Sequence, residues 1–189
     1  RDLNKSEFEE QTIRGWVGNG ARVLTQRALS GSAVIDQQLE VSVVNDALAI
    51  FLKHYQQCVC VNSVLYDDVK PSLLALKESG YRLAIITNKP EQFIQPILVG
   101  LGIDGLFETL IGGDTIPQRK PDPAPLYLAL SKLNVTAQEC VMIGDSKNDI
   151  LAAKAANIDS VGLTYGYNYG ENISLYQPNA GCDKFNDFF

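Results

Sequence analysis

Two aspartates lie four positions apart, at the point where an apolar run gives way to a helical pattern. The run 141–143 is apolar and ends in a glycine and Asp145, and Asp149 follows in the first turn of the predicted helix. A buried strand of this kind would deliver Asp145 to its carboxyl end, where open α/β sheets bind ligands. Ser146 and Asn148 add a hydroxyl and an amide, and such an oxygen-rich cluster suits Mg²⁺. The alternative is that Asp145 only caps the helix.

A hydroxyl and an amide follow a second apolar run. Residues 83–86 predict a buried strand, and Thr87 and Asn88 come directly after it. Both side chains can donate hydrogen bonds to an oxyanion at the carboxyl end of the strand. The local alternative is that they cap the helix that we expect to begin at Pro90.

A lysine lies between these two strands, in a stretch stiffened by prolines. Lys120 belongs to the sequence RKPDP (119–123). A lysine held in this way can neutralise a phosphoryl group as a point charge. The alternative is a solvated surface lysine, which is the commoner situation. The three features follow one another in a definite order: a strand ending in Thr-Asn, then Lys-Pro before a helix, then a strand ending in Gly-Asp-x-x-x-Asp. This order places all three at one edge of a sheet and predicts a phosphoryl site.

The elements that must position these residues fall into two regions. Residues 1–62 read as helical: Phe8, Ile13 and Trp16 share one helix face, and two further helices are expected over 21–29 and 34–55. Residues 63–189 alternate strands and helices. Helices are expected after Pro71, from Pro90 with an interruption at Pro96, and over 123–133 and 149–156, and strands over 83–86, 110–111, 141–143 and 160–163.

Alternating strands and helices predict right-handed crossovers and a parallel sheet covered on both faces. The expected fold class is therefore α/β, with a Rossmann-like parallel sheet in residues 63–189 and a small α-helical cap domain in residues 1–62. We expect the start of the cap and the first strand of the core to be missing from the chain.

Composition narrows the range of partners. The 189 residues carry a net charge of −6, which argues against nucleic acid or an anionic membrane as the main partner. No apolar stretch approaches the length of a membrane span. Only two of the four cysteines, Cys58 and Cys60, lie close together in the sequence, so we do not expect a zinc site. We expect the cysteines to be reduced thiols in the cytoplasm. We expect a monomer or a homodimer that acts on a small-molecule phosphate ester.

The order of the three features resembles the haloacid-dehalogenase superfamily of phosphotransferases. Thr87 matches its second motif, Lys120 its third, and Gly144-Asp145 with Asp149 its fourth. The helical region is similar to the small cap of that superfamily. Two stretches, 16–29 and 161–178, together with TNKP and KPDPAPL, are similar to bacterial phosphoglycolate phosphatases.

The resemblance implies a role for each residue. Thr87 and Asn88 would hold the transferring phosphoryl oxygens, and Lys120 would neutralise the phosphoryl group and the nucleophile. Asp145 would ligate Mg²⁺, and Asp149 would orient Lys120 or a metal-bound water. The implied reaction is magnesium-dependent hydrolysis of 2-phosphoglycolate through an aspartyl-phosphate. The alternatives are another small substrate, such as pyrophosphate or a sugar phosphate, and a catalytically inactive binding module.

The superfamily's first motif bears on the alternative of a catalytically inactive binding module. The first motif, a strand ending in Asp-x-Asp-Gly-Thr that carries the nucleophile, does not occur in the sequence. Arg1 to Asn4 reads as an entry into the middle of a longer chain, so we expect the motif to precede Arg1.

The cap contains the candidates for substrate recognition. Gly18, Asn19 and Gly20 precede a predicted helix, and the backbone N–H groups there can bind a carboxylate. Arg22 and Arg27 lie close behind in the sequence, and Arg22 is the expected substrate cation. The alternative is a plain helix break with surface arginines.

Overall fold

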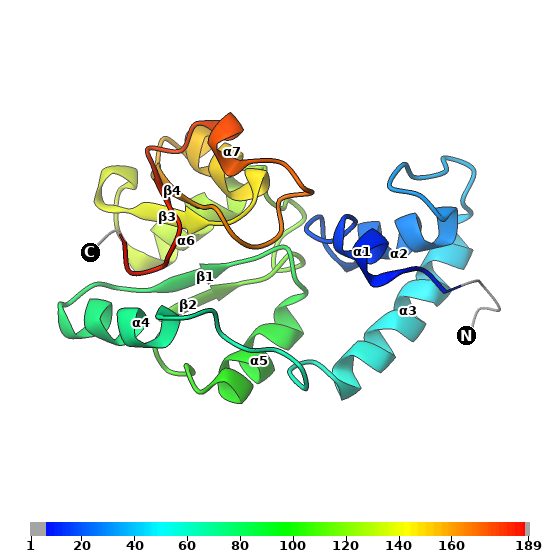
Figure 1. Cartoon of the computed structure of the whole chain (residues 1–189), viewed down its shortest axis with the longest axis horizontal. Coiled ribbons are helices and arrows are strands. Elements are labelled where there is room, and N and C mark those ends of the chain that lie inside the picture. Colours follow the sequence, from blue (N-terminus) through cyan, green and yellow to red (C-terminus); the bar gives the residue numbers. More distant parts are fainter. Residues whose placement is uncertain (1–6, 188–189) are drawn as a thin grey trace.

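The computed structural model describes residues 7–187, so Arg1 to Asn4 and the segment expected before them lie outside the described residues. Figure 1 shows two lobes: the smaller contains the first three helices, and the larger contains all the strands. The proposed division at residue 62 falls in a stretch without helix or strand, between residues 58 and 68. None of the described helices combines the length and apolarity needed to span a membrane.

The small lobe consists of α1 (Glu10–Arg14), α2 (Ala21–Ser30) and α3 (Val41–Gln57). The third helix begins seven residues later than the expected Val34. Side chains take up the backbone N–H groups of the intervening loop: Asp36 N–H donates to Ser30 Oγ at 2.9 Å, and Gln38 N–H donates to Asp36 Oδ1 at 2.8 Å. This loop therefore satisfies its donors without forming a helix.

All strand pairs of the large lobe are parallel, as predicted. β1 (Ala84–Ile86) pairs with β2 (Thr109–Ile111), and β3 (Val141–Gly144), β4 (Asp159–Leu163) and β5 (Ala180–Cys182) pair in that order. Within residues 7–187 the strands form two sheets, one of β1 and β2 and one of β3, β4 and β5. β5 is not among the predicted strands, because Ala-Gly-Cys has little of the β-branched and aromatic character that marks a strand.

The helices of the large lobe lie close to the predicted positions. They are α4 (Val69–Glu78), α5 (Ile94–Leu101), α6 (Ala124–Leu133) and α7 (Lys147–Ala156), with short 3₁₀ turns η1 (Glu91–Phe93), η2 (Ala137–Glu139) and η3 (Ile173–Tyr176). The predicted interruption at Pro96 does not occur: α5 runs unbroken through Pro96, and the break lies earlier, where η1 passes into α5 at Ile94. Pro96 thereby falls in the first turn of α5, where its missing N–H needs no partner.

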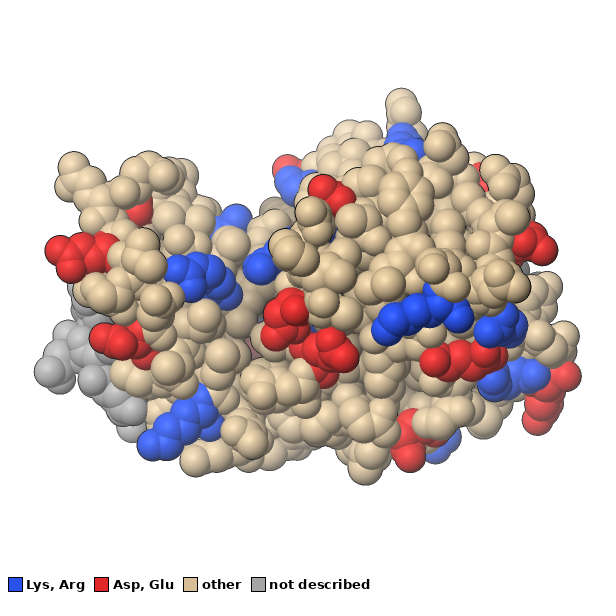
Figure 2. All heavy atoms as spheres, turned by 180° about the vertical axis from the view of Figure 1, so that it is seen from behind, with Lys and Arg blue, Asp and Glu red and all other residues tan. Residues whose placement is uncertain are grey.

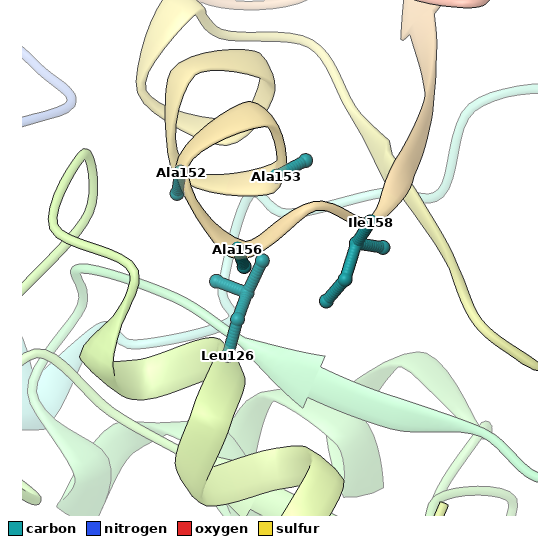
Figure 3. Close-up of a cluster of buried hydrophobic side chains, with 5 residues drawn as sticks. All are labelled: Leu126, Ala152, Ala153, Ala156 and Ile158. Atoms are coloured by element: carbon teal, nitrogen blue, oxygen red, sulfur yellow. The ribbon is translucent and has the colours of Figure 1, made fainter. Parts of the chain in front are cut away.

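Two apolar clusters cover opposite faces of β1. Ile86 packs against Leu126 of α6 and the alanines of α7, a cluster that Figure 3 shows in close-up. Ile85 packs on the other side, against Leu73 of α4 and Ile94 of α5. Consecutive residues of a strand point to opposite faces, so β1 is anchored from both sides. The end of the strand is therefore a fixed platform for the residues that follow it.

Within the described part of the chain, β1 pairs only with β2, and β3 pairs only with β4. Their other edges line one groove with a volume of about 1280 Å³. Its walls are mainly apolar, and at one end it reaches Thr87, Lys120 and Asp145. The groove thus runs between β1 and β3 and reaches the residues of the predicted phosphoryl site.

Candidate active site

Lys120 is buried and forms an ion pair with Asp149. The distance from Lys120 Nζ to Asp149 Oδ1 is 2.6 Å, and each side chain is 8% exposed. The ammonium group also donates to the carbonyl oxygen of Ile86, the last residue of β1. The alternative of a solvated surface lysine is therefore wrong. A buried ammonium needs such partners, since a lone buried charge is strongly destabilising.

The first turn of α7 holds Asp149 in place. Ser146 is the N-cap residue, and Asp149 Oδ2 accepts a hydrogen bond from Ser146 N–H at 3.0 Å, which completes a capping box. The alternative that Asp145 caps this helix is wrong. Gly144 makes room for the arrangement, because a Cβ at this position would overlap the Asp149 side chain.

Thr87 and Asn88 lie where β1 ends, as expected, but their side chains have different hydrogen-bond partners. Thr87 Oγ accepts from Lys89 N–H at 3.2 Å, so its hydroxyl proton stays available to another acceptor. Asn88 Nδ2 donates to the carbonyl oxygens of Gly18 and Lys120, both at 2.9 Å. The Asn88 amide therefore ties the small lobe and the Lys120 loop to the end of β1.

Asp145 follows β3 and is the carboxylate best placed to meet a cation. Its Oδ2 accepts a hydrogen bond from Tyr167 N–H at 2.8 Å. The loop can approach because a Cβ at Gly166, where φ is +106°, would overlap this carboxylate. Burial raises the pKa of Asp145, and the N–H of Tyr167 opposes the shift. A bound cation would favour the ionised form in the same way.

The other donors near Asp145 are few. Both oxygens of Asp149 already accept hydrogen bonds, from Lys120 and Ser146. Among residues 7–187, no group of three His, Cys, Asp or Glu side chains could hold a metal ion. Mg²⁺ is commonly held by one or two carboxylates together with waters and substrate phosphate oxygens. Asp145 is thus the residue of this site that would hold a metal ion, with water and substrate oxygens as the remaining ligands.

The loop Gly18–Gly20 of the small lobe docks against this site. Gly18 O accepts from Asn88 Nδ2, and also from Asn148 Nδ2 at 3.2 Å. Tyr169 connects the lobes again: its hydroxyl donates to Asn19 Oδ1 at 2.9 Å and accepts from Asn148 Nδ2 at 3.0 Å. The loop is therefore fixed over the carboxyl ends of β1 and β3.

The structure brings most of the predicted residues together. Thr87, Asn88, Lys120, Asp145 and Asp149 lie around the ends of β1 and β3, with Gly18, Asn19 and Gly20 above them. Arg22 points elsewhere: its Nη1 donates to Asn45 Oδ1 of α3 at 2.8 Å, within the small lobe.

Two residues near the site were missed. Tyr169 is not among the predicted site residues, because nothing in an aromatic loop indicates a contact 150 residues away. Arg119 was read only as part of the proline-flanked motif, yet its guanidinium lies against Gly20. Figure 2 shows Lys and Arg side chains beside the hollow between the lobes, with acidic side chains close by.

Comparison with known proteins agrees with this geometry. The family model for haloacid dehalogenase-like hydrolases matches residues 4–163. A phosphoglycolate phosphatase of Colwellia psychrerythraea is 68% identical over 187 residues, which are 99% of this chain and 83% of that protein. A phosphoglycolate phosphatase of Vibrio cholerae is 46% identical over 183 residues, covering 97% of this chain and 81% of the relative.

The fold is shared with solved structures. The crystal structure of a predicted phosphoglycolate phosphatase from Haemophilus somnus 129PT has a TM-score of 0.90 and 40% identity, and the match covers 99% of this chain and 84% of that one. With a family model that spans most of the sequence and relatives this similar, the chain belongs to the haloacid dehalogenase-like hydrolases.

Proposed function

We propose that the protein is a magnesium-dependent phosphoglycolate phosphatase, which hydrolyses 2-phosphoglycolate to glycolate and phosphate. The observation that carries the proposal is the buried Lys120–Asp149 pair at the ends of β1 and β3, beneath a docked cap loop. The names of the relatives at 68% and 46% identity support this substrate. In the net reaction one water is consumed: its oxygen ends on the released phosphate, and one of its protons ends on the ester oxygen, which leaves as the hydroxyl group of glycolate.

Lys120 supplies the positive charge in this proposal. Its ammonium is fixed by Asp149 and by the Ile86 carbonyl, so it needs no reorganisation when negative charge grows on the phosphoryl oxygens. Thr87 donates its free hydroxyl proton to a phosphoryl oxygen. The Asn88 side chain positions the cap loop and the Lys120 loop, because its amide group donates to the carbonyl oxygens of Gly18 and Lys120.

Asp145 is the proposed ligand of Mg²⁺. Asp145 would hold the ion, which would supply positive charge to offset the negative charge of the phosphoryl group. Tyr167 N–H holds one carboxylate oxygen in a fixed direction, which orients the ligand before the metal arrives. The nucleophile that the family resemblance implies is an aspartate of an Asp-x-Asp-Gly-Thr motif, and we assign no residue of the described chain to that role.

The proposed setting is the cytoplasm, with a monomer or a homodimer as the assembly. The four cysteines support it, since each is a free thiol in the structure. Size-exclusion chromatography with light scattering would decide between the two assemblies. The net charge of −6 supports a small phosphate ester rather than nucleic acid as the partner.

The test is a substrate panel on the full-length protein with Mg²⁺. We expect kcat/KM for 2-phosphoglycolate to exceed the values for pyrophosphate and a hexose phosphate by at least about tenfold, the discrimination that one extra favourable contact provides. Equal values would contradict the narrow substrate but keep the phosphatase. Failure to release phosphate from any of them would favour the binding module.

A further inference from the structure

Three arginines lie near the cap loop, and two of them are bound to acceptors of the small lobe. Arg22 donates to Asn45 Oδ1 at 2.8 Å. Arg27 Nη1 donates to the carbonyl oxygen of Trp16 at 2.6 Å and to Asn19 Oδ1 at 3.0 Å. Both guanidinium groups therefore support the cap itself, which leaves the third arginine as the available cation.

The third is Arg119, which comes from the core. It is half-buried, and its guanidinium makes no hydrogen bond or ion pair with another of residues 7–187. Its Nη1 lies 2.9 Å from the position that a Cβ would take at Gly20, and the carbonyl oxygen of Asn88 lies 3.1 Å from that position. Gly20, with φ of +89°, thus leaves the space that the guanidinium enters.

Arg119 and Lys120 are consecutive, and their cationic groups have different surroundings. Lys120 Nζ contacts Asp149 and the end of β1, where the phosphoryl group is proposed to bind. The Arg119 guanidinium meets the cap loop at Gly20, beside Asn88. Asn88 is common to both surroundings: its Nδ2 donates to the Lys120 carbonyl oxygen at 2.9 Å, and its own carbonyl oxygen lies beside Gly20. A short substrate with an anionic group at each end is the ligand that would match both cations.

We propose that Arg119 binds the carboxylate of the substrate and so selects phosphorylated short-chain acids over neutral phosphate esters. The inference rests on the proposed phosphatase function. The planar guanidinium offers parallel N–H donors that match the two oxygens of a carboxylate, which an ammonium group cannot do. The guanidinium lies against the cap loop at Gly20, and Asn88 and Asn148 hold that loop through the carbonyl oxygen of Gly18.

The test compares two substrates that share a phosphoester and a two-carbon chain. One is 2-phosphoglycolate, and the other is 2-hydroxyethyl phosphate, in which CH₂OH replaces the carboxylate. For Arg119→Met in the full-length protein with Mg²⁺, we expect kcat/KM to fall roughly 10- to 100-fold for 2-phosphoglycolate, as for a lost hydrogen bond to a charged group. For 2-hydroxyethyl phosphate we expect a change of less than about threefold, which also shows that the variant folds.

Two further variants sharpen the result. Arg119→Lys keeps the charge but loses the paired donors, so we expect only partial recovery of the 2-phosphoglycolate rate. Arg22→Met is the matched comparison, and its two rates should change in the same proportion. Equal losses on both substrates in Arg119→Met, or a selective loss in Arg22→Met instead, would overturn the inference.

Failure of the inference can be told apart from failure of the proposed function. If wild-type protein already hydrolyses 2-hydroxyethyl phosphate as well as 2-phosphoglycolate, the carboxylate is not recognised, and both the narrow substrate and the role of Arg119 are wrong. If wild-type protein prefers 2-phosphoglycolate and Arg119→Met keeps that preference, only the role of Arg119 is wrong.

Discussion

Two lysine–carboxylate pairs flank the first turn of α7, and their surroundings differ. On the inner side Lys120 and Asp149 are 2.6 Å apart, and each side chain is 8% exposed. On the outer side Lys147 and Glu171 are 2.9 Å apart, with side chains 30% and 40% exposed. Tyr169 and Tyr176 lie beside Lys147, with ring centres 4.8 Å and 5.7 Å from its Nζ.

Burial decides which of the two ion pairs can act in catalysis and which only supports the surface of the protein. Water screens the outer pair, so it contributes little to stability and can exchange partners. The inner pair is shielded, which makes its field strong at the phosphoryl site and its loss destabilising. Asp145 belongs to the desolvated side, since burial raises its pKa.

Removal of the Asp145 carboxylate should have the largest effect on turnover. Asp145→Ala deletes the proposed metal ligand, so we expect Mg²⁺-dependent phosphate release to fall below detection. Burial already disfavours the ionised carboxylate, as the raised pKa indicates, so the melting temperature without metal should not fall. Measurable Mg²⁺-dependent release would contradict the assignment.

Replacement of each lysine tests the comparison directly. Lys120→Met should lower kcat by about 100- to 1000-fold, since it removes a fixed positive charge from the transition state. Lys147→Met is the control, and its kcat should stay within about threefold, as expected for a screened surface charge. A loss of less than tenfold for Lys120→Met would remove this lysine from the mechanism.

The same inner pair should dominate stability. Lys120→Met leaves Asp149 buried without its cation, which should lower the free energy of unfolding by about 3–5 kcal/mol. Combining it with Asp149→Asn should recover part of that loss, because the uncompensated charge disappears while an acceptor for Ser146 N–H remains. Urea denaturation of the two single variants and the double variant measures this coupling, and strictly additive losses would argue against it.

A smaller effect on catalysis is expected at Tyr169, which lies beside Lys147 of the outer pair and contacts the cap loop. Tyr169→Phe removes the hydroxyl that joins Asn148 to Asn19, while the ring stays beside Lys147. Loss of these hydrogen bonds should raise KM for 2-phosphoglycolate roughly two- to tenfold, with kcat nearly unchanged. Steady-state kinetics would show this split, and a fall in kcat alone would place Tyr169 in the chemical step instead.

The smallest effect should be a change in acid sensitivity at the outer pair. The Tyr176 hydroxyl and the Lys147 ammonium hold the pKa of Glu171 below its ordinary value. A lowered carboxyl pKa stabilises the fold above the ordinary value and loses that contribution as pH falls through the lowered one. The melting temperatures of wild type and Glu171→Gln should therefore differ at pH 7 and converge in acid, and a constant difference would contradict the ion pair.

Much of the fold and of the site followed from local patterns. Lys120, Asp145 and Asp149 were predicted to lie near one another because apolar strands and proline-flanked turns fix where polar side chains emerge. The start of α3 was misplaced because Ser30 and Asp36 satisfy the backbone of the loop before it. Such side-chain bonds compete with the helix, and apolar spacing does not reveal them.

The sequence by itself determined the α/β class, the parallel strands and the chemistry gathered at their carboxyl ends, because strand and helix periodicity and turn residues are local properties. Only the tertiary structure decided which cation faces which part of the site. Arg119 meets Gly20 of the cap, and Tyr169 meets Asn19, across long stretches of chain. Such contacts depend on how the two lobes dock, and docking depends on shape and hydrogen bonds that no local pattern specifies.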